Sequence, residues 1–134
     1  MSDVRNLRAW HCARALVLDV IDAMPERAPR RVPGLRSQAI RAATSIPANL
    51  AEGCARSSRA EFLHFVEIAL GSLNELETHL SLAGDTGVIA KARAARLTRD
   101  VVIVRKLLTG LRRSVQRELA EREATRSDAR LPSE

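Results

Sequence analysis

Residues 61–83, EFLHFVEIALGSLNELETHLSLA, carry the pattern that decides the fold. Apolar residues recur along this stretch at alternating steps of four and three, and residues 94–115 show the same alternation. An average step of 3.5 residues is typical of helices that pack knobs into holes against a neighbour. We therefore predict two long, packed helices. Their predicted seams are Phe62, Val66, Ala69, Leu73, Leu76 and Leu80 in the first stretch, and Ala94, Leu97, Val101, Val104, Leu108, Leu111 and Val115 in the second.

Caps and helix breakers divide the chain into four expected helices. Asp3 is the expected N-cap of the first helix. Ser57 or Ser58 is the expected cap of the third helix, with Glu61 completing a capping box with Ser58, and glycines 84 and 87 end that helix. Three prolines occur within residues 25–34, so we expect a loop rather than a helix there. Short connections between long helices predict an all-α fold, an antiparallel up-down-up-down four-helix bundle. The helices are expected at about 4–23, 35–55, 59–83 and 89–123, within a single domain covering residues 1–123.

A proline stands inside the second expected helix, in RAATSIPANLAEG at residues 41–53. Pro47 removes one backbone hydrogen bond and crowds the preceding turn, so we expect a kink. Ser45 or Asn49 can bond to nearby backbone groups, and Glu52 can pair with Arg56 four residues later. This polar stripe, which we expect to join the helix to a neighbour, consists of Arg41, Ser45, Asn49, Glu52 and Arg56.

The composition places limits on the class of protein. No run approaches the length of apolar sequence that spans a membrane, and the N-terminus does not resemble a signal peptide, so we expect a cytoplasmic protein. Cys12 and Cys54 fit neither a disulfide framework nor a zinc site. Residues 124–134 have too little apolar content to order themselves, so we expect a disordered tail. Gly71 and Gly110 lie inside expected helices. We expect each glycine to allow a neighbouring helix to approach closely.

Two stretches carry a family resemblance: QAIRAATSIPANLAEG at 38–53 and EFLHFVEIALGSLNELETHLSLA at 61–83, with Trp10 and Ala13 also in place. The chain resembles the small four-helix-bundle family that includes the intervening-sequence proteins encoded within large-subunit ribosomal RNA genes. It is also distantly similar to accessory proteins of diversity-generating retroelements, which bind nucleic acid and a reverse transcriptase. The resemblance implies a bundle that assembles into a ring-like oligomer, a pentamer, and it establishes no enzymatic reaction.

The residues themselves offer little for catalysis. Glu61 and His64 form one Glu-x-x-His motif, whereas a di-iron bundle site needs two such motifs and two further inward carboxylates. Cys12 follows His11 directly, and adjacent helical residues do not face each other. We expect no metal, no cofactor and no catalytic residue, so the protein is predicted not to be an enzyme.

The last expected helix has a basic face. Arg99, Lys106 and Arg113 occupy the outermost heptad position, and other arginines flank them. No aromatic residue accompanies them, so RNA or DNA bound here would be contacted through phosphates rather than stacked bases. The alternative is a face that is only solvated. The candidate nucleic-acid-binding residues are Arg99, Arg105, Lys106, Arg112, Arg113 and Arg117.

Several apolar residues on the last two helices lie outside the predicted seams. A lone bundle cannot bury them all, and monomers rarely expose large contiguous apolar patches, so we expect a homo-oligomer larger than a dimer. The candidate interface residues are Leu63, Phe65, Ile68, Leu70, Val102 and Ile103. The predicted function is that of a non-enzymatic, oligomeric accessory or scaffold protein associated with nucleic acid. The alternative is a protein-interaction module without nucleic-acid affinity.

Overall fold

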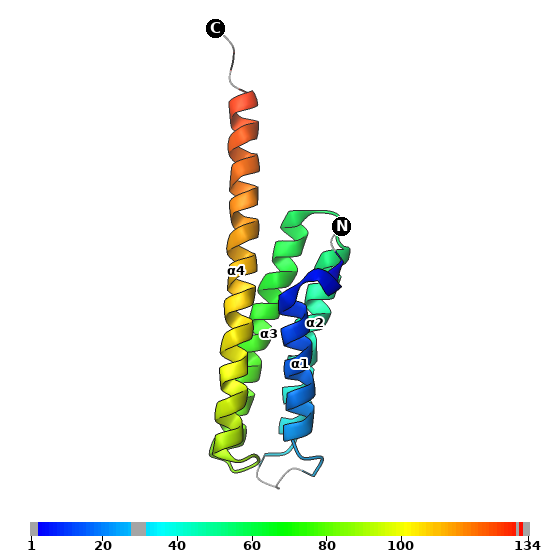
Figure 1. Ribbon diagram of the computed structural model, residues 1–134, viewed down its shortest axis with the longest axis vertical. Helices are drawn as coiled ribbons and strands as arrows, with labels where there is room; N and C mark the ends of the chain where they lie inside the picture. Colours follow the sequence, from blue (N-terminus) through cyan, green and yellow to red (C-terminus); the bar gives the residue numbers. More distant parts are fainter. Residues whose placement is uncertain (1–2, 28–31, 131, 133–134) are drawn as a thin grey trace.

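The computed structural model describes residues 3–27, 32–130 and 132. Helices that follow one another in the chain run antiparallel and lie side by side (Figure 1), which confirms the predicted all-α four-helix bundle. The elements are a short 3₁₀ turn, η1 (Val4–Asn6), and the helices α1 (Arg8–Ala23), α2 (Leu35–Ala55), α3 (Arg59–Asp85) and α4 (Lys91–Ala129).

The predicted seams of α3 and α4 form the centre of the core. Every seam residue of α3 is buried, and on α4 all are buried except Leu111, which is half-buried. Apolar side chains from α1 and α2 complete the core, and the described residues include no buried polar or charged residue. Burial of apolar surface on one face of each helix is therefore what holds the bundle together.

The first helix begins later than expected. The Asp3 carboxylate accepts a hydrogen bond from the Arg5 backbone N–H at 2.9 Å, and it caps η1 rather than α1. Leu7 then adopts an extended conformation with φ −87° and ψ 117°, and α1 starts at Arg8. At this break in the helix, Leu7 is half-buried and packs against the core.

Helix α2 runs through Pro47 without interruption. The Thr44 hydroxyl donates to the carbonyl of Ile40 at 2.9 Å, and Asn49 Nδ2 donates to the carbonyl of Ser45 at 2.7 Å. Side-chain donors thus bond to carbonyls on the turns around the proline. The surrounding residues Ala43, Ile46 and Leu50 are all 0% exposed, and their packing offsets the intrinsic cost of an internal proline.

Helix α3 begins at the predicted cap and ends slightly later than predicted. Ser58 Oγ accepts a hydrogen bond from the Glu61 backbone N–H at 3.1 Å, as the capping box requires. At the other end the helix continues through Gly84 to Asp85. Gly87, with φ +77°, then supplies the left-handed backbone conformation that turns the chain toward α4.

Two close helix contacts depend on glycine, at positions other than those predicted. A Cβ atom on Gly53 of α2 would lie 2.9 Å from Phe65 Cβ of α3, and one on Gly84 of α3 would lie 2.9 Å from Ala94 Cβ of α4. The prediction for Gly71 and Gly110 is wrong, because a Cβ atom at either would meet no atom of the described chain within 4 Å.

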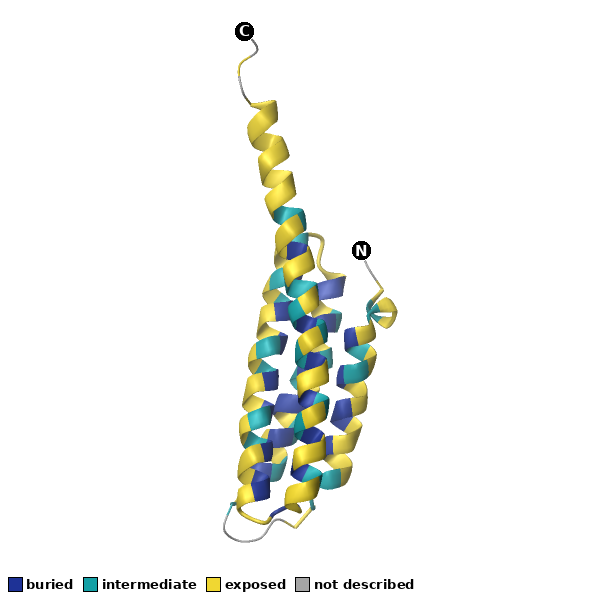
Figure 2. Cartoon of the chain, turned by 60° about the vertical axis from the view of Figure 1, so that its left-hand side comes forward, coloured by how far each residue is buried: buried dark blue, intermediate teal, exposed yellow. Residues whose placement is uncertain are grey.

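Helix α4 continues six residues beyond its expected end, to Ala129. The expectation that residues 124–134 are entirely without order is therefore wrong for 124–129. No glycine or proline occurs between Gly110 and Pro132, and the region is rich in good helix formers. Every residue from 120 to 130 is exposed, and this part of α4 extends past the other three helices (Figures 1 and 2). Low apolar content prevents packing here but does not prevent helix formation.

None of the helices in the described part of the chain is apolar over a length sufficient to cross a membrane.

Candidate nucleic-acid interface

The outward face of α4 carries a row of exposed bases. Arg99, Lys106, Arg113 and Arg117, which we call the α4 basic row, are all exposed. The first three are spaced by seven residues, or about 10 Å along the helix axis. Within the described residues, no carboxylate forms an ion pair with any of the four. Their charges are therefore available to an anionic partner.

The other two predicted residues occupy a different side of the helix. Arg105 faces α3, where its guanidinium donates to Glu77 Oε1 at 2.9 Å and to Asn74 Oδ1 at 3.0 Å. These bonds join the two helices and use the charge of Arg105 within the chain. Arg112 is half-buried. The candidate phosphate-binding surface therefore consists of the four residues of the α4 basic row, rather than the six residues predicted from the sequence.

Some of the predicted interface residues are partly covered by their own chain, and the others are exposed. Leu63 and Leu70 are half-buried and pack against the core of their own chain, so part of their apolar surface is covered without a second subunit. Phe65 is half-buried over Gly53, and the Arg56 guanidinium lies 5.1 Å from the centre of its ring. The remaining three are exposed: Ile68 by 38%, Val102 by 37% and Ile103 by 51%. Three further large apolar residues are exposed that were not predicted from the sequence: Leu18, Ile21 and Leu82.

The polar stripe of α2 contacts α3. Ser45 Oγ lies 2.8 Å from Ser72 Oγ, and Asn49 Nδ2 donates to the same Ser45 oxygen at 2.9 Å. Glu52 and Arg56 form the expected ion pair, with Arg56 Nη2 2.7 Å from Glu52 Oε1. Arg41 is exposed at the start of the stripe. Among these contacts, the Ser45–Ser72 hydrogen bond alone crosses to α3, and the others lie within α2, so the stripe joins the two helices at Ser45.

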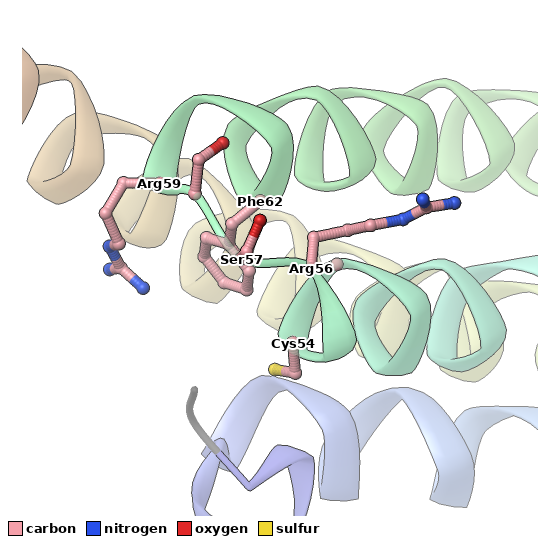
Figure 3. A pocket seen from close by; sticks show the side chains of 7 residues that line it. Cys54, Arg56, Ser57, Arg59 and Phe62 are labelled. Atoms are coloured by element: carbon pink, nitrogen blue, oxygen red, sulfur yellow. The ribbon is translucent and has the colours of Figure 1, made fainter.

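A small cavity of about 90 Å³ lies at the turn between α2 and α3, lined by residues that include Cys54, Ser58 and Phe62. Arg56 and Arg59 at its rim extend away from it in opposite directions (Figure 3), and they pair with Glu52 and Glu118. Burial raises the pKa of the Cys54 thiol. A raised pKa lowers the thiolate fraction, which makes Cys54 a poor nucleophile.

The residues of the Glu-x-x-His motif have structural roles. Glu61 belongs to the cap of α3, and the exposed His64 ring packs edge-on against Phe65 with ring centres 5.4 Å apart. His79 lies on the same helix, with Nε2 3.4 Å from Glu75 Oε1. The described residues contain no group of three His, Cys, Asp or Glu residues close enough to hold a metal ion.

Comparison with known proteins places this bundle in a family. The family model described as 23S rRNA-intervening sequence protein matches residues 5–110. The chain belongs to this family. The region matched by the family model ends at residue 110. Arg113 and Arg117, which are half of the α4 basic row, lie beyond it.

A solved structure supports the same fold. It is a protein of unknown function from the S23 ribosomal protein family of Bacteroides thetaiotaomicron, 25% identical to this chain, with a TM-score of 0.69. The alignment covers 78% of this chain and 97% of that one. No curated protein matches the chain.

Proposed function

We propose that this member of the 23S rRNA-intervening sequence family is a non-enzymatic accessory or scaffold protein that binds the phosphate backbone of RNA or DNA. The observation that carries the proposal is the α4 basic row, whose four exposed cations have no carboxylate partner in the described chain. Residues 91–117 contain nine Lys and Arg residues and a single acid, Asp100. A surface of this kind attracts a polyanion and releases its counterions on binding.

The bound nucleic acid would be recognised by shape more than by sequence. The α4 basic row contains guanidinium and ammonium groups and no aromatic side chain on which a base could stack. Contacts to phosphates position a protein on a duplex without reading its sequence. Duplexes of unrelated sequence are therefore expected to bind with similar affinity.

Reversal of three charges in the row tests the proposal. The variant Arg99→Glu, Lys106→Glu, Arg113→Glu is expected to bind duplex RNA or DNA at least about tenfold more weakly at low salt. The slope of log affinity against log salt is expected to become shallower by about 0.9 for each DNA phosphate that the variant no longer neutralises. Fluorescence anisotropy with a labelled duplex measures both quantities.

A matched control separates this surface from net charge. The variant Arg8→Glu, Arg27→Glu, Arg41→Glu reverses three exposed arginines elsewhere and has the same net charge. It is expected to bind far more tightly than the α4 variant. Equal affinities for the two variants would contradict the proposal, provided that circular dichroism shows both to be fully helical.

We also propose that the chain forms a homo-oligomer larger than a dimer, and five copies is the number that the family resemblance suggests. Six large apolar side chains are exposed in the described chain, and Ile103 is 51% exposed. Light scattering at micromolar concentration is expected to give several times the 14.7 kDa mass of one chain. A mass close to one chain would contradict self-association.

A second function, that of a protein-interaction module without nucleic-acid affinity, is favoured by one observation. Val102 and Ile103 are exposed on α4 among the residues of the basic row. Apolar side chains contribute little to phosphate binding but much to contact between proteins. Absence of all duplex binding at low salt, together with an intact oligomer, would support this second function.

A further inference from the structure

Helix α4 continues past the end of the bundle at which α2 turns into α3 (Figures 1 and 2). Residues 120–130, which we call the α4 extension, are all exposed. They also lie beyond residues 5–110, which the family model matches. The extension adds nothing to the core of its own chain, so its surface is available to a partner.

Three arginines of the extension lie on the inward side of α4, the side on which Leu108 and Val115, both 0% exposed, face the core. Arg122 follows Val115 by seven residues, close to two helical turns. Arg126 follows Leu108 by eighteen residues, or about five turns, and Arg130 follows after one more turn. The side of α4 that is apolar within the bundle is therefore basic beyond its end.

Contacts at the end of the bundle agree with this orientation. Glu118 Oε2 accepts a hydrogen bond of 3.1 Å from Arg59 Nε at the start of α3, and Arg122 Nη2 lies 4.0 Å from the same oxygen. One carboxylate thus lies between two guanidinium groups. Among the described residues, no carboxylate forms an ion pair with Arg126 or Arg130.

The acids of the extension do not cancel this charge. Glu121 and Asp128 are offset from Arg126 by five and two residues, which places both on the far side of the helix. Glu123 lies at the edge of the inward side. Counted with Glu118, it gives the inward side and the adjoining start of α3 two acids against four arginines.

The side chains at this end of the bundle suit phosphates better than a protein surface. No large apolar side chain is exposed among the described residues 52–62 and 115–130, whereas contact between proteins depends on a desolvated apolar centre. The one aromatic residue in these segments, Phe62, is 4% exposed, so no base can stack on it. Arginine is the residue best suited to bind phosphate, through its planar set of donors.

We propose that the inward side of the α4 extension and the adjoining end of the bundle form a second surface that binds the phosphates of duplex RNA or DNA. We call this surface the α4 shelf: Arg59, Arg122, Arg126 and Arg130. The choice of a nucleic acid as its ligand rests on the proposed function, whereas its position and charge do not.

The α4 shelf and the α4 basic row lie on opposite sides of one helix. The cations of the row therefore stay exposed when the shelf is occupied. A straight duplex cannot contact both sides of α4 at once, so each chain holds two duplex segments, one on each side. This arrangement makes the chain a bridge between two segments of nucleic acid.

Counting the duplexes bound per chain tests the second surface. The variant Arg122→Glu, Arg126→Glu, Arg130→Glu is expected to bind half as many short duplexes per chain as the wild-type protein at low salt. The triple charge reversal in the α4 basic row is also expected to halve the number, and the two sets combined to abolish binding. Sedimentation followed by absorbance of protein and nucleic acid measures the ratio.

Hydrogen exchange locates the contact. The amides of a lone helix exchange readily because opening it costs little free energy, and a ligand held by arginines on successive turns opposes that opening. With free duplex at about ten times its Kd, exchange in residues 120–130 is expected to slow about tenfold in the wild-type protein. The same slowing is expected in the α4 basic row variant, and none in the variant with Glu at 122, 126 and 130.

Two controls accompany these measurements. The variant Arg27→Glu, Arg41→Glu, Lys91→Glu removes the same charge toward the opposite end of the bundle and is expected to keep the wild-type number of duplexes. Three neighbouring glutamates repel one another and can unwind the extension. The variant Arg122→Gln, Arg126→Gln, Arg130→Gln avoids that repulsion with residues of similar helix propensity, and it is expected to lose the shelf as well.

The possible failures can be told apart. Unchanged exchange in residues 120–130 while the wild-type protein binds duplex would overturn the α4 shelf and leave the proposed function intact. An unchanged number of duplexes in the Gln variant would do the same. Failure of the wild-type protein to bind any duplex would refute the proposed function and the shelf together.

Discussion

Replacement of Leu73 by alanine is expected to lower the free energy of unfolding by about 3 kcal/mol. Leu73 is 0% exposed at the middle of α3, where α2 packs on one side and α4 on the other. The decrease combines the transfer energy of the removed atoms with the cost of the cavity that remains, since helices on both sides limit collapse. Urea unfolding followed by circular dichroism measures the change.

An exposed leucine provides the control for this substitution. Leu18 on α1 is 56% exposed, so Leu18→Ala is expected to change the free energy of unfolding by less than about 0.5 kcal/mol. Both variants must be compared at one protein concentration, because self-association adds to apparent stability. Equal effects for Leu73→Ala and Leu18→Ala would contradict the assignment of the core.

The second large effect is expected at Gly53, where alanine should destabilise the bundle by about 1–2 kcal/mol. Alanine normally stabilises a helix interior relative to glycine by up to about 1 kcal/mol. Here the new Cβ atom would lie 2.9 Å from Phe65 Cβ and 3.2 Å from Phe62 Cδ1. The Phe65 Cβ atom is fixed by the backbone, so α2 and α3 must move apart, and the overlap outweighs the gain in helix propensity.

Gly110 offers the matched comparison. A Cβ atom there would meet nothing within 4 Å, so Gly110→Ala is expected to raise the free energy of unfolding by up to about 1 kcal/mol. The two substitutions thus have the same chemistry and opposite expected signs. A stabilising Gly53→Ala would show that α2 and α3 are not in close contact at this position.

The bundle could be predicted from the sequence because its signals are local. The seam of α3, from Phe62 to Leu80, repeats every 3.5 residues whatever it packs against, and Ser58 and Glu61 mark the helix start through contacts within one turn. The boundaries of α2 matched the structure for the same reason. Errors arose where a local signal had two readings, as for Asp3, which caps a 3₁₀ turn rather than α1.

The candidate site was predicted less well, because periodicity places a residue on a side of a helix without naming its neighbour. Arg105 and Lys106 are adjacent in sequence and both basic, yet one pairs with Glu77 of α3 and the other is exposed. Leu63 and Ile68 are both apolar residues of α3, yet Leu63 packs against the core and Ile68 is exposed. Heptad spacing placed Lys106 outermost and Arg105 beside it, but it could not identify Glu77 as the partner of Arg105, because that residue lies far away in the sequence.

The sequence by itself determined the helical class, the order of the helices and the side of each that is buried, because these follow from hydrophobic periodicity, caps and breakers within a few residues. Only the tertiary structure decided which charges stay free. It also showed which glycines lie at helix contacts, since Gly53 is needed where Phe65 approaches and Gly71 is not. The physical reason is that ion pairing and steric overlap depend on distances between helices, and packing of the whole bundle sets those distances.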